Sequence, residues 1–324
     1  MLSGEKILIT GVSGQIAGPL ARYLAKDNEV WGIARFRPAE AGLIRQVVDE
    51  TDPRRALEEA GITTLPVDLA SGDFGDLPAD FTYVLHLAVY QTDGLDYDTA
   101  LRTNAEGTGL LMSHCRNATA FLHMSTCSVY KPNPDPYHVY VESDPLGDNE
   151  SPFSPTYSVS KIAAEGVART CARAFDLPTV IARMEVSYGA NGGWPAYMFD
   201  GMRAGYAVPL QAPGPNLHGP IHEDDICEQA GKLLEAAATP AVVVNWAGDD
   251  IVSCEDWLDY MGELTGLPHT VEYQDRWITN SAPDATRRTA LVGPCRVRWK
   301  DGFRRMLAER YPDVPLQDGD GARS

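Results

Sequence analysis

Near its start the chain reads Lys6-Ile7-Leu8-Ile9-Thr10-Gly11-Val12-Ser13-Gly14-Gln15-Ile16-Ala17-Gly18. The apolar, β-branched run at residues 6–10 stops at a glycine, which is typical of a buried parallel strand. A helical pattern continues through residues 20–24. Gly11 and Gly14 would let the backbone turn sharply, so that amide groups and the positive end of the helix could hold a pyrophosphate. An idle turn is the alternative, but the place between strand and helix favours dinucleotide binding.

Strands and helices alternate along the first half of the chain. Strand-like runs occupy residues 30–34, 62–67, 83–88, 120–125 and 179–183, and helical composition marks residues 95–115 and 157–175. This alternation predicts an α/β fold with a Rossmann-type, doubly wound parallel sheet, in which ligands lie beyond the carboxyl ends of the strands. The residues at those ends are Gly11, Arg35, Asp68, Ala88 and Thr126. We therefore expect the site at this edge of the sheet.

The second half is expected to complete the sheet, with a strand at 241–246, and to add a smaller part. The predicted division is a Rossmann domain at residues 1–187, to which residues 220–250 return, and a substrate-binding part at residues 188–219 and 251–324. Residues 208–219 are rich in Pro and Gly and are predicted to be loop. The acidic residue Glu223 and the capping residue Ser253 predict helix starts. The polar tail at 318–324 is predicted to be disordered.

The composition excludes several classes of protein. The chain has 324 residues, of which 44% are hydrophobic and 22% charged, and its net charge is −18. Such a surface would repel a nucleic acid, and no apolar run approaches the roughly 20 residues that span a bilayer. Its six cysteines are scattered, so we expect reduced thiols in a cytoplasmic protein. His218 and His222 are four apart, but Gly219-Pro220 between them opposes a helix, so no metal site is expected.

The stretch Tyr157-Ser158-Val159-Ser160-Lys161 carries the chemistry that we predict. Tyr157 and Lys161 are four apart, so on a helix they share one face. A phenol has a pKa of about 10, and an ammonium one turn away would lower it. Thr126 is the candidate hydroxyl that would hold a substrate oxygen against the tyrosine. The alternative for the stretch by itself is an ordinary solvated helix face.

A long loop at residues 131–156 connects Thr126 with Tyr157. Its prolines exclude a long helix or a central strand. Because loops of this length in compact domains are often functional, we expect this one to flank the site. Further along, Tyr197, Met198, Phe199 and Met202 could line an apolar pocket or belong to the core, and core is the safer interpretation.

Cofactor choice depends on the end of the second strand. An NAD enzyme usually has Asp or Glu there, about 20 residues after the glycines, to bind the ribose hydroxyls. This chain has Arg35 and then Arg37. A guanidinium would attract the 2′-phosphate of NADP, so we predict NADP, with NAD the less favoured cofactor. The alternative is that either arginine merely covers the sheet edge.

Taken together, these motifs resemble those of the extended short-chain dehydrogenase/reductase family, which also contains nucleotide-sugar epimerases and dehydratases. The resemblance is carried by Thr10-Gly11-Val12-Ser13-Gly14, His86-Leu87-Ala88, Asn104-Ala105-Glu106-Gly107-Thr108, Ser125-Thr126-Cys127-Ser128-Val129-Tyr130, Tyr157-Ser158-Val159-Ser160-Lys161, Arg183-Met184-Glu185-Val186-Ser187-Tyr188-Gly189 and Ile221-His222-Glu223-Asp224-Asp225-Ile226. These motifs follow the family's order over most of the chain. They are specific for the fold and the cofactor class and much less specific for the substrate.

The resemblance implies a role for each matching residue. Tyr157 would be the general acid/base, Lys161 would lower its pKa and bind the nicotinamide ribose, and Thr126 would bind the reacting oxygen. The expected cofactor-binding residues are Gly11, Gly14, Gln15, Ile16, Arg35, Asp68, Leu69, Leu87, Ala88, Tyr157 and Lys161. Asn104 resembles the family's helix-bending asparagine. A homodimer through the helices that hold Asn104 and Tyr157 is also implied.

Two departures from the family's motifs bear on the reaction. Cys127-Ser128 follow Thr126 where the 4,6-dehydratases place an acidic pair, so we do not expect that elimination. Leu217 and His218 stand where epimerases usually carry an arginine for the substrate diphosphate. Arg287 and Arg288 could compensate, or they could be exposed helix charges.

The sequence thus favours an NADP-dependent oxidoreductase that transfers hydride reversibly between nicotinamide and a carbonyl carbon, with Tyr157 as general acid/base. A nucleotide-sugar epimerase with tightly bound NAD(P) is the alternative. A cofactor-sensing regulator without turnover is a third hypothesis, which the presence of both Tyr157 and Lys161 disfavours. The substrate would be a small carbonyl compound or a sugar nucleotide.

Overall fold

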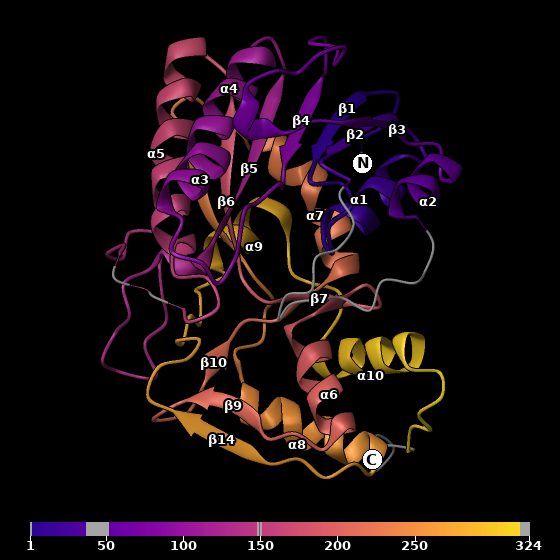
Figure 1. Ribbon diagram of the computed structural model, residues 1–324, viewed down its shortest axis with the longest axis vertical. Coiled ribbons are helices and arrows are strands. Elements are labelled where there is room, and N and C mark those ends of the chain that lie inside the picture. Colours follow the sequence, from indigo (N-terminus) through magenta and orange to yellow (C-terminus); the bar gives the residue numbers. More distant parts are fainter. Residues whose placement is uncertain (1, 37–51, 148, 150, 318–324) are drawn as a thin grey trace.

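The computed structural model describes residues 2–36, 52–147, 149 and 151–317 (Figure 1). Two of the sequence predictions, on Arg37 and on the tail at 318–324, lie outside these residues. The described chain forms a large parallel sheet with helices on both faces, and a smaller part lies below the sheet in Figure 1.

The central sheet has seven strands, all paired in parallel. In spatial order they are β12 (Val242–Trp246), β6 (Thr179–Met184), β5 (Ala120–Thr126), β4 (Tyr83–His86), β1 (Lys6–Thr10), β2 (Glu29–Ala34) and β3 (Thr63–Pro66). The order of the strands reverses between β1 and β4, which is where a doubly wound sheet opens a crevice for its ligand. The predicted fold class is therefore confirmed.

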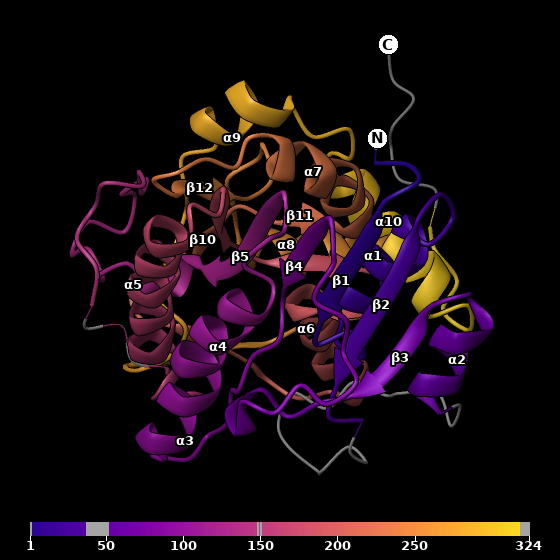
Figure 2. The same cartoon turned by 90° about the horizontal axis from the view of Figure 1, so that it is seen from above.

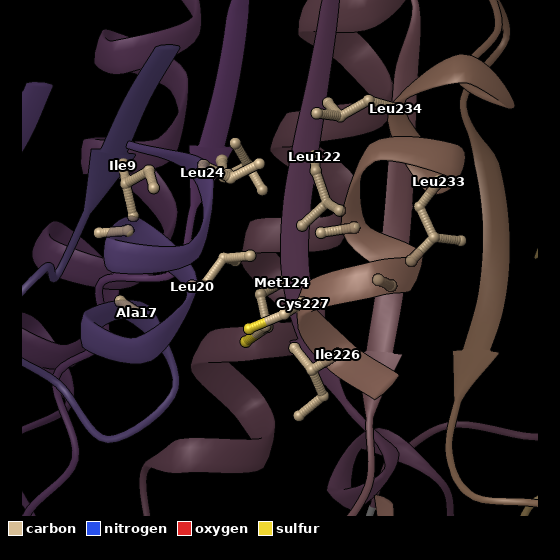
Figure 3. Packing of buried hydrophobic residues seen from close by; sticks show 14 of the residues in the cluster. Ile9, Ala17, Leu20, Leu24, Leu122, Met124, Ile226, Cys227, Leu233 and Leu234 are labelled. Atoms are coloured by element: carbon tan, nitrogen blue, oxygen red, sulfur yellow. The ribbon is translucent and has the colours of Figure 1, made fainter. Parts of the chain in front are cut away.

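Two apolar layers cover the faces of this sheet. The α-helices of the described residues are α1 (Ala17–Leu24), α2 (Pro53–Glu59), α3 (Tyr97–Leu101), α4 (Gly107–His114), α5 (Tyr157–Phe175), α6 (Trp194–Ala204), α7 (Glu223–Glu235), α8 (Cys254–Thr265), α9 (Thr286–Val292) and α10 (Trp299–Arg310). Figure 2 shows α4 and α5 on one face and α7 and α9 on the other. Side chains alternate along β1, so Ile7 and Ile9 join the α1 and α7 core (Figure 3) and Leu8 joins the α4 and α5 core.

The helical stretch predicted at 95–115 is divided in three. Between α3 and α4 the segment Arg102–Glu106 is a π-helix. Asn104 lies in it and is buried. Its Oδ1 accepts from the amide of Tyr90 at 2.7 Å, and its Nδ2 donates to the Tyr90 carbonyl and to Ser160 Oγ, each at 2.9 Å. One side chain in the π-helical segment thus joins the loop after β4 to helix α5.

The smaller part has its own core, which includes Trp257 and Phe303. Its short strands are β7 (Ser187–Gly189), β8 (Gly192–Gly193), β9 (Val208–Gln211), β10 (Leu217–His218), β11 (Ile221–His222), β13 (Val252–Ser253) and β14 (Val271–Gln274). The prediction of loop throughout 208–219 is therefore wrong, because β9 pairs with β14 and β10 pairs with β13. The prolines that suggested loop at 213 and 215 lie between these strands. The predicted helix starts at Glu223 and after Ser253 are confirmed.

Candidate active site

A cavity of about 660 Å³ lies at the carboxyl ends of the central strands. Eight residues predicted from the sequence line it: Gly11, Gly14, Gln15, Ile16, Leu87, Thr126, Tyr157 and Lys161. The opposite wall comes from the smaller part, through α6, β9 and residues 277–278. The cavity therefore lies where the order of the sheet strands reverses, as expected for a ligand site in this fold.

The glycine turn forms one wall of this cavity out of backbone. Gly11 has φ of +68°, and a Cβ atom at this position would lie 2.8 Å from the Cα of Ala88. The amide of Gly14 donates to the Gly11 carbonyl at 2.8 Å. Thr10 Oγ1 accepts from the amides of Leu87 and Ala88, at 3.1 and 2.9 Å, and so fixes the end of β4 against the turn. This cradle at a helix N-terminus fits the pyrophosphate of a dinucleotide.

Three side chains meet on the next wall. Tyr157 begins α5, Lys161 lies one turn further along the same face, and Thr126 is the last residue of β5. The hydroxyl groups of Tyr157 and Thr126 form a hydrogen bond, and Lys161 Nζ donates to the Met124 carbonyl at 2.6 Å. The structure thus brings together the three residues that the sequence predicted as catalytic.

The pKa of Tyr157 differs from the prediction. Burial raises it to about 12, and this outweighs the hydrogen bond from Thr126, which lowers it. Burial also lowers the pKa of Lys161 to about 8, against the opposing charge of Glu165. The expectation that Lys161 depresses the pKa of the phenol is therefore wrong for the protein without ligands, because loss of solvent around the hydroxyl dominates.

A buried ion pair supports this wall from behind. Glu165 lies one turn beyond Lys161 and accepts two hydrogen bonds from Arg183, from Nε at 2.9 Å and from Nη2 at 2.8 Å. Ser125 Oγ donates to the same carboxylate at 2.6 Å. Arg183 belongs to β6 and Ser125 to β5, so the pair ties α5 to two strands. Bidentate pairing of this kind fixes geometry as well as adding energy.

Aromatic side chains form the wall opposite the glycine turn. They are Phe153, Trp194, Tyr197, Tyr206 and Trp277. Phe153 comes from the 131–156 loop, which thus flanks the cavity, and its ring meets that of Trp277 edge-on at 4.2 Å. Of the four residues for which pocket and core were both open, Met198, Phe199 and Met202 lie in the core, and Tyr197 and Met198 line the cavity.

One carboxylate in the cavity wall was missed by the sequence analysis. Glu185 follows β6, and its side chain is only 3% exposed. Its Oε1 accepts from His218 Nδ1 and from Ser281 Oγ, each at 2.7 Å. These three residues are separated by 33 and 63 positions, so no local spacing in the sequence could have joined them.

Some predicted cofactor residues lie outside the cavity wall. Arg35, Asp68, Leu69 and Ala88 are not among its lining residues. Arg35 is exposed at the end of β2, and Asp68 accepts from the amide of Ala70 at the start of a short 3-10 turn. All of these still lie at or beside the carboxyl ends of their strands.

The two arginines considered as diphosphate ligands do not reach the cavity. Arg288 is fully buried and pairs with Asp249, so the alternative of an exposed helix charge is wrong for it. Arg287 donates to the Val243 carbonyl at 2.8 Å.

Within the described residues, no three His, Cys, Asp or Glu side chains gather as a metal site would need. None of the described helices has both the length and the apolar character to cross a bilayer.

Curated relatives match part of the chain. A dTDP-glucose 4,6-dehydratase of Neisseria gonorrhoeae is 29% identical over 202 residues, which cover 57% of this chain and 55% of that protein. A dTDP-glucose 4,6-dehydratase of Escherichia coli strain K12 is 27% identical over 202 residues, with the same coverage. The chain thus spans about half the length of the curated relatives that it matches.

Solved structures share the fold over nearly the whole chain. A UDP-glucuronic acid 4-epimerase of Bacillus cereus, in complex with UDP-glucuronic acid and NAD, is 23% identical with a TM-score of 0.79, over 95% of this chain and 100% of that one. A UDP-glucose 4-epimerase of Thermotoga maritima is 18% identical with a TM-score of 0.75, over 95% and 99%. A family model described as the NAD dependent epimerase/dehydratase family matches residues 7–248. The chain therefore belongs to the NAD dependent epimerase/dehydratase family.

Proposed function

We propose that this protein is a nicotinamide-dependent enzyme that oxidises and re-reduces a hydroxyl-bearing carbon of a sugar nucleotide, as an epimerase does. One observation carries the proposal. The hydrogen-bonded pair Thr126 and Tyr157, with Lys161 one helical turn away, shares a cavity with the Gly11–Gly14 turn. The family, together with its sugar-nucleotide relatives, supports this reading over the net oxidoreductase that the sequence favoured.

Each of the three residues has a task in this proposal. When bound, the dinucleotide would supply the carbon that accepts and returns a hydride. Tyr157 takes the proton of the substrate hydroxyl and later gives it back, while Thr126 holds the same oxygen. A pKa of about 8 leaves Lys161 charged at pH 7, so its ammonium can hold the ribose of the dinucleotide, as the family resemblance implies. The high pKa of the phenol favours its protonated form, which is the proton donor when the ketone is reduced again, whereas the oxidation step requires the phenolate.

The experiment mixes the protein and NAD with UDP-glucose, UDP-glucuronic acid and dTDP-glucose in turn. We expect inversion of one sugar carbon, followed by nuclear magnetic resonance, with a small burst of reduced nicotinamide and no steady accumulation. Tyr157→Phe is the control, because it removes the proton carrier and keeps the ring. Product formation that persists in this variant would overturn the proposal.

A second candidate function is an NADP-dependent reductase with net turnover. Two observations favour it: Arg35 is an exposed cation at the end of β2, and the cavity wall opposite the glycine turn is largely aromatic. A reductase would consume NADPH steadily with a carbonyl substrate, whereas an epimerase would not. Comparing NADP with NAD in a thermal-shift titration, with Arg35→Glu as the variant, tests the cofactor preference separately from the reaction.

The roles of the two parts of the chain and the formation of a homodimer are also proposals. We propose that residues 1–187 and 220–250 bind the dinucleotide and that residues 188–219 and 251–324 bind the substrate, which is supported by the two different cavity walls. A homodimer through α4 and α5 is supported by the exposed side chains of Leu110 and Val159, which are 42% and 47% accessible. Light scattering behind a sizing column measures the dimer directly.

A further inference from the structure

Glu185 lines the same cavity as the group that we propose to react. In the β5–β6 pairing, Thr126 is the partner of Met184, and Glu185 is the next residue along. Adjacent strands lie about 4.8 Å apart. Glu185 therefore follows the strand next to Thr126, and it lines the same cavity as Thr126 and Tyr157.

The Glu185 carboxylate is held by hydrogen bonds and not by an ion pair with a lysine or arginine of the described chain. Among the described residues that line the cavity, Lys161 and Glu185 are the only charged ones. The groups that hydrogen-bond to Glu185 are the imidazole of His218, the hydroxyl of Ser281 and the thiol of Cys127. His218 is itself fixed, because its ring packs against Trp194 at 4.9 Å and Trp257 at 5.7 Å.

The other buried carboxylate near the site is built differently. Glu165 is clasped by both arms of Arg183 and takes a third hydrogen bond from Ser125. A carboxylate bound in this way is committed to structure. Glu185 accepts from His218 and Ser281 on one oxygen, Oε1, has the neutral Cys127 thiol as a third partner, and lines the cavity, which is the arrangement of an oriented acid or base.

We propose that Glu185 is a second acid–base residue, which exchanges the proton on the carbon next to the one that Tyr157 helps to oxidise. The inference rests on the proposed function, because oxidation of the hydroxyl carbon to a ketone makes the neighbouring C–H acidic. The Glu185 carboxylate takes this proton, the C–H electron pair forms a C=C bond, and the carbonyl oxygen becomes an enolate oxygen held by Thr126 and Tyr157. Return of the proton restores the ketone, and no oxidant is consumed.

This assignment also bears on the missing acidic pair. Cys127-Ser128 occupy the positions after Thr126, and on that ground the sequence analysis did not expect an elimination. Glu185 supplies a carboxylate from the end of the neighbouring strand β6 instead, beside the Cys127 thiol, whose pKa is raised by burial and by the Glu185 charge. The cavity wall thus contains a carboxylate, although it comes from another part of the sequence.

The experiment is run in D₂O with NAD and, in turn, UDP-glucose, UDP-glucuronic acid and dTDP-glucose. We expect the wild-type protein to place deuterium on the carbon adjacent to the oxidised one, as read by nuclear magnetic resonance and mass spectrometry. Glu185→Gln should slow this exchange by about 100-fold or more, which is the usual size of a general-base effect. The burst of reduced nicotinamide should persist in this variant, because hydride transfer uses Tyr157.

Glu223→Gln is the matched control. Glu223 is a carboxylate outside this cavity whose Oε1 accepts from the Ala190 amide at 2.9 Å, so it tests whether loss of any inward-facing acid disturbs the site. Circular dichroism melting checks that both variants fold.

The outcomes separate the two proposals. Deuterium that enters at the same rate in Glu185→Gln overturns the role of Glu185, and so does a nicotinamide burst in the wild type without any deuterium. Absence of the burst with all three sugar nucleotides overturns the proposed function itself. Exchange that is lost in Glu185→Gln and kept in Glu223→Gln supports the inference.

Discussion

The two walls of the cavity are made in different ways. The first wall, by which we mean the glycine turn together with the adjoining residues Tyr157 and Lys161, consists of backbone and of residues close in sequence, such as Gly11 with Gly14 and Tyr157 with Lys161. The second wall is the aromatic one opposite it, and it consists of residues from segments far apart in the chain, such as Phe153, Trp194 and Trp277. A wall built from local spacing serves a cofactor that many proteins share. In a wall assembled from distant segments, substitutions can alter one segment without the others. Substrate specificity can therefore diverge among related proteins at this wall.

The largest effect is expected at the first wall. Tyr157→Phe removes the hydroxyl that bonds Thr126 and keeps the buried ring, so we expect turnover to fall by about 10³-fold while cofactor affinity stays the same. Turnover and a thermal-shift titration with NAD measure the two quantities. A fall in cofactor affinity as large as the fall in turnover would mean that Tyr157 serves binding and not proton transfer.

Gly11→Ala tests whether the first wall depends on backbone alone. The added Cβ would lie 2.8 Å from the Ala88 Cα, at a residue with φ of +68°. We expect the free energy of unfolding to fall by about 2 kcal/mol and dinucleotide binding to weaken strongly. Gly4→Ala is the matched control, because Gly4 has φ of +75° and nothing within 4 Å of the new Cβ. Equal losses of dinucleotide affinity in both variants, measured by calorimetry, would contradict the close-approach argument.

Lys161→Met should stabilise the protein without ligands. In the folded protein the pKa of Lys161 is about 8, against 10.5 for a free side chain, so burying its charge costs up to about 3 kcal/mol at pH 7. Loss of the hydrogen bond to the Met124 carbonyl offsets part of this, and we expect a gain of about 2 kcal/mol.

The pH dependence of that gain is specific. Below pH 8 the lysine is protonated in both the folded and the unfolded chain, so the gain is complete. As the pH rises from 8 toward 10.5, only the unfolded chain keeps the proton, the cost disappears and the two proteins converge. Urea unfolding at pH 7 and pH 9.5 measures this, and a gain that does not change with pH would point to packing instead.

Trp277→Ala probes the second wall and should have the smallest effect. Its ring meets Phe153 at 4.2 Å in the cavity, so its loss should raise KM by about 10-fold through lost contact area and leave the NAD-induced melting shift unchanged. Tyr273→Ala is the control, because Tyr273 is an exposed aromatic on β14 that does not line the cavity. A change in the NAD shift would show that the two walls are not separate.

The sequence could predict what depends on local spacing. The strands, the glycine turn and the pair Tyr157 and Lys161 follow from apolar runs and from residues three to five apart. The pKa of Tyr157 could not be predicted, because it depends on how deeply the hydroxyl is buried. The burial of Arg288 could not be predicted either, because its partner Asp249 is 39 positions away.

The second wall was beyond local reasoning for the same physical cause. Strand β9 pairs with β14 across about 60 residues, so the prolines nearby were a poor guide. Glu185 meets His218 and Ser281 only after the chain has folded. Such a cluster can be recognised only once the fold shows which distant residues lie side by side.

Asn104 links the loop after β4 to the start of helix α5. Its amide grips both backbone groups of Tyr90 and also the hydroxyl of Ser160, which sits in the opening turn of α5 with Tyr157. A shift of the loop after β4 is consequently passed on to the phenol. We expect a ligand that displaces Leu87 to change the rate of proton transfer at Tyr157 as well as its own binding affinity, so that binding and reaction are coupled.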